Sequence, residues 1–259
     1  MRLGISSWSY HRTIETGKLD QIGWIEKSAK ELKLDGVEIL DIHFPQTDEK
    51  YLRNLKKLCT DLRLDIYILS ATSNFGKATD EERREELKKL KNWIDVGYYL
   101  GVPIVRYFAG VPTPDRDVSE SWSELIKLTK EAVDYSSSKG IVLALENHHG
   151  FIKTSEDVFK LTQGISSDWF KLCLDLGNYK DLYVSIEKTI DLSAIVHAKM
   201  YGADGNGIER KLDYNKIFDI LKNSNYNGWL SIEYEGEAEE GTTIPECVKY
   251  LRKMIQKYE

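Results

Sequence analysis

Eight short apolar segments recur along the chain, and each is followed by a longer segment whose apolar residues have helical spacing. The apolar runs are residues 3–8, 35–40, 64–71, 102–108, 141–147, 170–177, 194–202 and 228–236. Runs of this length are typical of buried strands. Strict alternation of strand and helix predicts a parallel sheet whose strands are joined by helical crossovers.

The number of strand and helix pairs favours a closed barrel. The helical segments are residues 21–33, 48–62, 85–101, 120–140, 153–165, 181–190, 214–225 and 245–259. An open doubly wound sheet usually has fewer strands and a glycine-rich phosphate loop after the first one, and no such loop follows Trp8. We therefore expect an α/β fold, a single (β/α)8 TIM barrel, forming one domain over residues 1–259.

Glycines stand at or just before the start of several of the apolar runs, at Gly36, Gly101, Gly140 and Gly228. A helix commonly ends in a left-handed residue, and glycine adopts that conformation without steric cost. We expect these four glycines to end helices.

Composition excludes several classes of function. The net charge of -6 disfavours nucleic-acid binding, which depends on lysine and arginine releasing counterions from phosphate. The apolar runs are too short to span a bilayer, and the first ten residues lack a signal-peptide pattern. Cys59, Cys173 and Cys247 are scattered and are expected to be small buried hydrophobes. A cytoplasmic location is expected, with neither a membrane nor a nucleic acid as partner.

Polar residues gather where the expected strands end, which is where barrels of this kind carry their catalytic groups. Along the chain they are Glu38, His43, Ser70, Asn74, Arg106, Glu146, Asn147, His148, Asp175, Asn178, His197, Lys199, Glu233 and Glu235. Residues two apart on a strand share a face. Glu146 should therefore point with His148, His197 with Lys199, and Glu233 with Glu235.

Four of these residues, Glu146, Asp175, His197 and Glu233, come from four successive strands and could converge on one point. Carboxylates buried in a barrel mouth are costly unless they are paired or bound to a cation. Three carboxylates with one imidazole form a hard, oxygen-rich ligand set. This pattern indicates one divalent metal, Mn²⁺ or Mg²⁺, with Co²⁺ or Zn²⁺ as substitutes.

The segments LALENHHG, LCLDLGNY, VHAKMYG and GWLSIEYEG resemble the ligand-bearing strands of the xylose isomerase-like TIM barrel superfamily. That superfamily includes sugar phosphate isomerases and epimerases, inosose dehydratases and apurinic endonucleases. The similarity spans all eight repeats and depends on the order and spacing of the motifs. It implies that Glu146, Asp175, His197 and Glu233 bind the metal, and that Glu146 and Glu233 form the catalytic acid and base pair.

The resemblance implies an isomerase or epimerase of a sugar, or of a sugar-like polyol or keto acid, that removes a proton beside a carbonyl through a metal-stabilised enediolate. Two glutamates on opposite faces would epimerise the substrate, whereas a single glutamate moving the proton between carbons would interconvert aldose and ketose. The sequence leaves this choice open. The substrate-binding candidates are Glu38, Arg106, His148, Lys199 and Trp8. Arg106 could instead form an ion pair with Glu38 or Glu146.

Other interpretations remain. Asn178 stands where sugar epimerases often have a histidine, and Met200 where an acidic residue is common, so the substrate is open and an inosose-type dehydratase is an alternative. An apurinic endonuclease is disfavoured because the chain has only five histidines. A non-catalytic sugar-binding barrel is a further alternative.

Beyond the site, residues 73–84, 109–121 and 201–211 are candidate lids. A small carbohydrate is the expected partner of the site, and the resemblance makes a homodimer possible.

Overall fold

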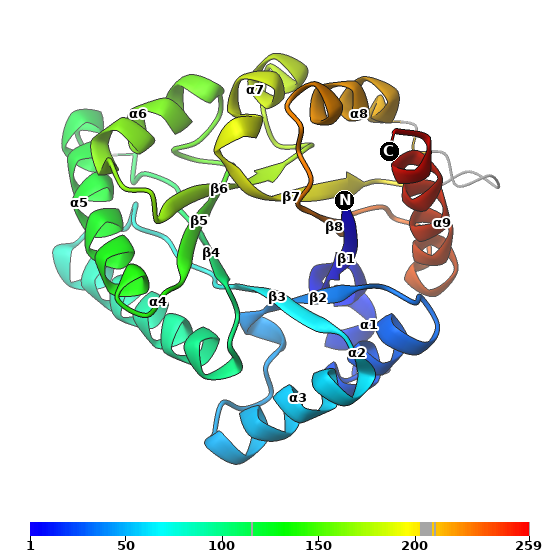
Figure 1. Ribbon diagram of the computed structural model, residues 1–259. Helices are drawn as coiled ribbons and strands as arrows, with labels where there is room; N and C mark the ends of the chain where they lie inside the picture. The colour runs from blue at the N-terminus through cyan, green and yellow to red at the C-terminus, as the bar shows by residue number, and fades with distance from the viewer. Residues whose placement is uncertain (115, 203–208, 210, 259) are drawn as a thin grey trace. The chain divides into compact units, whose positions relative to one another are not determined.

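The strands of the protein form a closed parallel barrel in the order β1 to β8, which confirms the predicted (β/α)8 fold (Figure 1). The computed structural model describes residues 1–114, 116–202, 209 and 211–258. The strands are β1 (Arg2–Ser6), β2 (Gly36–Leu40), β3 (Asp65–Ser70), β4 (Ile104–Phe108), β5 (Val142–Glu146), β6 (Phe170–Asp175), β7 (Ser193–Met200) and β8 (Trp229–Tyr234). All eight lie within the apolar runs expected from the sequence or extend one residue beyond them.

The helices follow the strands as the periodicity predicts. They are α1 (His11–Glu15), α2 (Gln21–Lys30), α3 (Glu49–Leu62), α4 (Asp80–Leu100), α5 (Val118–Ser137), α6 (Ser155–Ile165), α7 (Leu182–Thr189), α8 (Tyr214–Asn223) and α9 (Glu240–Tyr258). The described residues also form short 3-10 turns, which are η1 (Ser7–Tyr10), η2 (Asp41–His43) and η3 (Ile190–Leu192). The sequence did not predict η1 or α1, because turns of four or five residues are too short to show a helical period.

The contacts of the chain define two compact units. Unit one comprises Met1–Tyr67 and Ile195–Glu259, and unit two comprises Ile68–Ala194. The expectation of a single domain over residues 1–259 stays a prediction.

In unit one, β1 pairs in parallel with both β2 and β8, and β8 pairs with β7. The register sets Lys199 opposite Glu233 and His197 opposite Ser231. Helix α2 packs on β2, and α9 packs on β8. The carboxyl ends of these strands therefore bring polar residues from distant parts of the sequence to one edge.

In unit two, β4 pairs with β5, and β5 pairs with β6, again in parallel. Helices α4, α5 and α6 lie side by side along the outer side of these strands (Figure 1). A capping box between Thr79 and Glu82 starts α4 at Asp80. Residues 80–84 of the lid expected over residues 73–84 therefore belong to α4, and the lid role stays a prediction. The lid expected over 109–121 is likewise shortened, since α5 begins at residue 118.

The expectation that glycines end helices is confirmed at Gly101 and Gly140, with φ of 81° and 71°. It is wrong at Gly36 and Gly228, where residues earlier in the chain take the left-handed conformation. These are Lys33 and Asn225, with φ of 52° and 55°.

Gly36 does not end a helix, because it is the first residue of β2. A Cβ atom at this position would lie 2.6 Å from the backbone oxygen of Asp65 and 2.7 Å from the ring of Tyr67. Close approach, and not backbone conformation, requires glycine here.

The three cysteines are free and buried, as expected. Burial raises the pKa of the Cys59 and Cys247 thiols to about 12, so both stay protonated at neutral pH. Among the residues that the structure describes, none of the helices is both long and apolar enough to cross a membrane.

Candidate active site

In unit two, β4 and β5 place a buried ion pair at their carboxyl ends. Nε of Arg106 lies 3.1 Å from Oε2 of Glu146, and each side chain is only 2% exposed. The guanidinium also lies over the Phe108 ring, 4.1 Å from its centroid. Of the two partners considered for Arg106, the structure shows this ion pair with Glu146, and the arginine offsets the charge of the buried carboxylate.

Asp175 ends β6 beside Glu146, and the Asn147 side chain holds its backbone. Nδ2 of Asn147 donates to the Asp175 carbonyl at 2.9 Å, and the Asp175 amide donates to Oδ1 of Asn147 at 2.6 Å. Oδ1 of Asp175 accepts from the amide of Gly177 at 2.7 Å. Glu146 and Asp175 each offer an oxygen within 4.8 Å of the other. Unit two therefore presents two buried carboxylates as a pair of oxygen donors.

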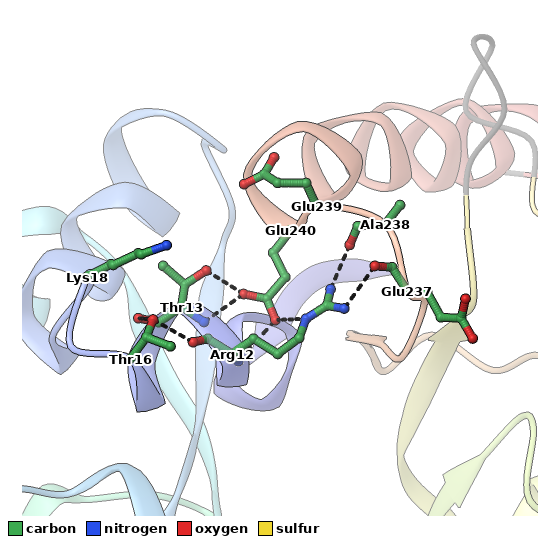
Figure 2. A pocket seen from close by; sticks show the side chains of 8 residues that line it. All are labelled: Arg12, Thr13, Thr16, Lys18, Glu237, Ala238, Glu239 and Glu240. Atoms are coloured by element: carbon green, nitrogen blue, oxygen red, sulfur yellow. Dashed lines mark hydrogen bonds and ion pairs between the residues drawn. The ribbon is translucent and has the colours of Figure 1, made fainter.

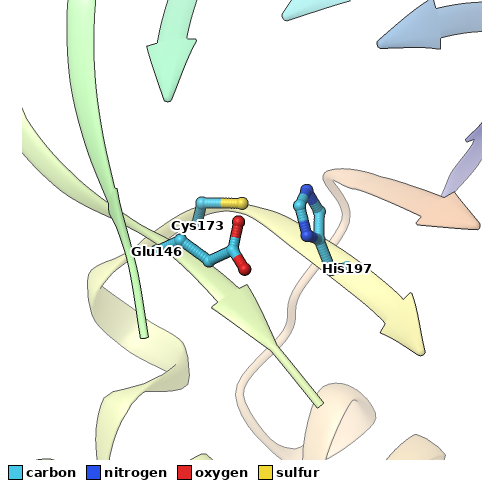
Figure 3. A group of neighbouring side chains, drawn as sticks. All are labelled: Glu146, Cys173 and His197. Atoms are coloured by element: carbon cyan, nitrogen blue, oxygen red, sulfur yellow. The ribbon is translucent and has the colours of Figure 1, made fainter. Parts of the chain in front are cut away.

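Cys173 is a neighbour of this pair that the sequence placed only in the core. It is the β6 residue opposite Glu146 in the register, and its Sγ lies within 4.8 Å of a Glu146 oxygen. Figure 3 shows the Glu146 and Cys173 side chains close to each other. The signal that could have found Cys173 is strand parity, because it lies two residues before Asp175.

In unit one, the His197 ring lies between two carboxylates. Nε2 of His197 is 3.1 Å from Oε1 and 3.0 Å from Oε2 of Glu38, and Nδ1 is 3.5 Å from Oε1 of Glu233. His197 and Glu38 are fully buried, and Glu233 is nearly so. Unit one therefore presents an imidazole and a carboxylate as neighbouring donors.

Lys199 and Glu233 form the second charged contact of unit one. Nζ of Lys199 lies 2.5 Å from Oε2 of Glu233 and 2.9 Å from Oε1 of Glu235. Since His197 and Lys199 both reach Glu233, the predicted parity of β7 is confirmed. The shared contact with Lys199 likewise confirms that Glu233 and Glu235 point together.

A chain of hydroxyl groups supports Glu38. Oγ of Ser231 donates to Oε2 of Glu38 at 2.6 Å, and the Tyr67 hydroxyl donates to Ser231 at 2.6 Å. The sequence did not single out Ser231 or Tyr67. Ser231 could have been found by parity, because it lies two residues before Glu233 on β8.

Trp8 and His148, the remaining substrate-binding candidates, each contact another aromatic ring. Trp8, on η1, stacks on His11 with ring centroids 4.3 Å apart, and the two rings are inclined by 10°. His148 packs against the Phe108 ring, with ring centroids 4.6 Å apart.

His43 is buried and hydrogen-bonded through Nδ1 to Oγ of Ser7, and desolvation lowers its pKa.

A polar pocket of about 380 Å³ lies between α1 and the segment that leads from β8 into α9 (Figure 2). Arg12 crosses it, donating to Glu240 and to the carbonyls of Glu237 and Ala238. The buried Glu240 carboxylate also accepts from the backbone amides of Arg12 and Thr13. The acidic segment after β8 thus caps the short helix α1, a contact that the sequence did not predict.

The third expected lid, residues 201–211, falls largely outside the described residues, since 203–208 and 210 are among those not described. In the part that is described, the amides of Tyr201 and Gly202 donate to Oε2 of Glu209 at 2.7 and 3.0 Å.

A family model described as xylose isomerase-like TIM barrel matches residues 27–254. The chain belongs to this family. It is also similar to L-ribulose-5-phosphate 3-epimerase UlaE of Salmonella heidelberg (strain SL476), with 24% identity over 259 aligned residues, covering 89% of this chain and 87% of the relative.

Solved structures show the same fold. The structure of an L-ribulose 3-epimerase has a TM-score of 0.79 at 16% identity, covering 99% of this chain and 95% of that one. A D-allulose 3-epimerase from Methylomonas sp. also has a TM-score of 0.79, at 15% identity, with 98% of each chain covered. At these identities the likeness establishes the fold, and activity has to be argued from the site.

Proposed function

We propose that the chain is a divalent-metal-dependent epimerase or isomerase of a small ketose or ketose phosphate. The observation that carries this proposal is that each unit buries two neighbouring side chains of types that bind metal ions. These are Glu146 and Asp175 in unit two, and His197 and Glu233 in unit one. These residues lie on the consecutive strands β5 to β8, in a family whose named relatives include sugar 3-epimerases.

The donor set fits such an ion. Three carboxylates and one imidazole provide hard ligands suited to Mn²⁺ or Mg²⁺. All four side chains are buried, and a bound cation would add to the compensation that Arg106 and Lys199 give to the carboxylate charges. When bound, the ion would supply electrophilic polarisation of a carbonyl and its neighbouring hydroxyl oxygen.

Glu146 and Glu233 are the proposed acid and base, and each lies beside a basic side chain. Arg106 holds Glu146 at 3.1 Å, and Lys199 holds Glu233 at 2.5 Å. Each glutamate would exchange a proton with the carbon beside the carbonyl, and a positioned acid or base contributes about 10²- to 10⁴-fold to the rate. Arg106 and Lys199 orient the two carboxylates and can donate to substrate oxygens.

The remaining candidates would define the walls of the substrate site. The Trp8 ring, held against His11, offers an apolar face to the carbon side of a sugar, and His148 offers a hydrogen-bonding ring.

The test is a panel of ketoses and ketose phosphates incubated in D₂O with the Mn²⁺-loaded protein, followed by NMR for deuterium beside the carbonyl. We expect exchange with the wild type and its loss on metal removal. Glu146→Gln and Glu233→Gln should each lower the rate at least ~10²-fold. Glu156→Gln, at an exposed ion pair with Lys188, is the matched control and should exchange at the wild-type rate. Exchange that survives metal removal or both glutamine substitutions would refute the proposal.

A further inference from the structure

Glu38 lies in direct contact with the His197 ring. Its side chain is fully buried, and its oxygens already contact Nε2 of His197 and accept a hydrogen bond from Oγ of Ser231. A carboxylate held in this way would have to give up those bonds in order to anchor a substrate hydroxyl. The expected substrate role of Glu38 therefore competes with a structural role that the geometry already fills.

The contact with Glu38 determines which nitrogen of His197 carries a proton. An ionised carboxylate only accepts hydrogen bonds, so Nε2 of His197, about 3 Å from both Glu38 oxygens, must be the protonated nitrogen. In the neutral ring, Nδ1 then has the lone pair. Nδ1 is the atom that lies 3.5 Å from Oε1 of Glu233, on the side of the other proposed ligand of unit one.

Two hydroxyl groups hold Glu38 in this position, and their order follows from the same rule. Ser231 must use its hydrogen on the Glu38 carboxylate, so it accepts from the Tyr67 hydroxyl, each at 2.6 Å. The chain Tyr67, Ser231, Glu38 and His197 is therefore a directed series of hydrogen bonds, all within unit one and almost fully buried.

The strands of unit one leave room for this arrangement. A Cβ at Gly4 would lie 2.3 Å from Cε1 of Tyr67, and one at Gly36 would lie 2.7 Å from Cδ1 of the same ring. The Trp229 ring stacks on the Tyr67 ring, with ring centroids 4.1 Å apart. Two glycines on neighbouring strands thus admit the ring whose hydroxyl begins the chain.

We infer that Glu38 is a positioning residue that holds His197 in the tautomer whose Nδ1 can bind a metal, with Tyr67 and Ser231 holding Glu38. The inference rests on the proposed function for the identity of the ligand. Outer carboxylates of this kind orient the ring and raise its basicity, and their loss typically costs 10- to 100-fold in metal affinity.

The first test needs no metal and no substrate. ¹⁵N-edited NMR of the metal-free protein should show a proton on Nε2 of His197 at low field, assigned by its absence in His197→Asn. Glu38→Gln should move that proton upfield, whereas Glu240→Gln, which removes another buried carboxylate of unit one, should leave it in place. An unprotonated Nε2 in the wild type, or an unchanged signal in Glu38→Gln, would overturn the inference.

The second test is a Mn²⁺ titration followed by electron paramagnetic resonance. We expect Glu38→Gln to bind Mn²⁺ about 10- to 100-fold more weakly than the wild type, Tyr67→Phe to show a smaller loss, and Glu240→Gln to match the wild type. If Glu38→Gln does not fold, the wild-type NMR signal and Tyr67→Phe still decide the matter. Wild-type affinity in a folded Glu38→Gln would count against the inference. A wild type that binds no Mn²⁺ yet shows the low-field Nε2 proton would overturn the proposed function and leave the tautomer assignment standing.

Discussion

Two buried glutamates, Glu146 of unit two and Glu38 of unit one, are held by different means. In unit two, Glu146 is held by the permanent charge of Arg106, and Asp175 is held by backbone and amide hydrogen bonds. In unit one, Glu38 is held by a neutral serine hydroxyl and a histidine ring. An arginine cannot lose its charge, whereas an imidazole can offer either nitrogen. Glu146 therefore depends on charge compensation, and Glu38 depends on the direction of its hydrogen bonds.

The largest loss of stability is expected when Arg106, the charged partner of Glu146, is replaced. Arg106→Met leaves Glu146 buried without its arginine, and loss of one partner of a buried ion pair costs about 3–5 kcal/mol in unfolding free energy. Adding Glu146→Gln should recover most of that loss, as measured by denaturant unfolding. Lys188→Met, from an exposed ion pair with Glu156, is the control and should change little. A double variant as unstable as Arg106→Met alone would argue against charge as the cause.

A smaller loss of stability is expected when the space that the Tyr67 ring occupies in unit one is reduced. In Gly4→Ala the added methyl would meet the Tyr67 ring, and overpacking of this kind costs about 1–3 kcal/mol. Thermal unfolding would measure it, with Gly202→Ala as control, because a Cβ at Gly202 has none of the described residues within 4 Å. Equal stability of the two variants would show that the ring is not confined by β1.

Loss of one hydroxyl from unit one should have a modest effect. Tyr67→Phe keeps the ring and its stacking on Trp229 but removes the donor to Ser231, at a cost of about 0.5–1.5 kcal/mol. Tyr135→Phe, whose hydroxyl bonds an exposed Asp95, should cost less in the same unfolding assay. A loss for Tyr67→Phe as large as that of Arg106→Met would contradict the distinction between Glu146 and Glu38.

The smallest expected effect is the pH response of His43 in unit one. Burial holds its pKa below the ordinary value of 6.5, so the unfolded chain binds a proton that the folded chain resists. The stability from this residue is complete above about pH 6.5 and declines as the pH falls toward the lowered folded-state pKa. His43→Asn should flatten this slope in denaturant unfolding between pH 7 and pH 5. A slope unchanged in His43→Asn would assign the pH response to other groups.

Much of the fold was predictable because its signals are local. Strand runs such as residues 141–147 and helical spacing such as residues 120–140 each act over a few turns, and their strict alternation leaves few topologies. Parity along one strand also predicted correctly that His197 and Lys199 share a face. Gly36 shows the limit, since the sequence could not show that Tyr67 and Asp65 crowd its Cα.

The amino-acid sequence by itself determined the (β/α)8 class, the positions of the strands and the polar residues that end them, because these depend on side-chain periods within short segments. Only the tertiary structure decided which of those residues are partners. It paired Arg106 with Glu146, and it joined Glu38 to His197 across 159 positions of the chain. Such pairings depend on strand register and on the volume of neighbouring side chains, and neither quantity is encoded in any single stretch of sequence.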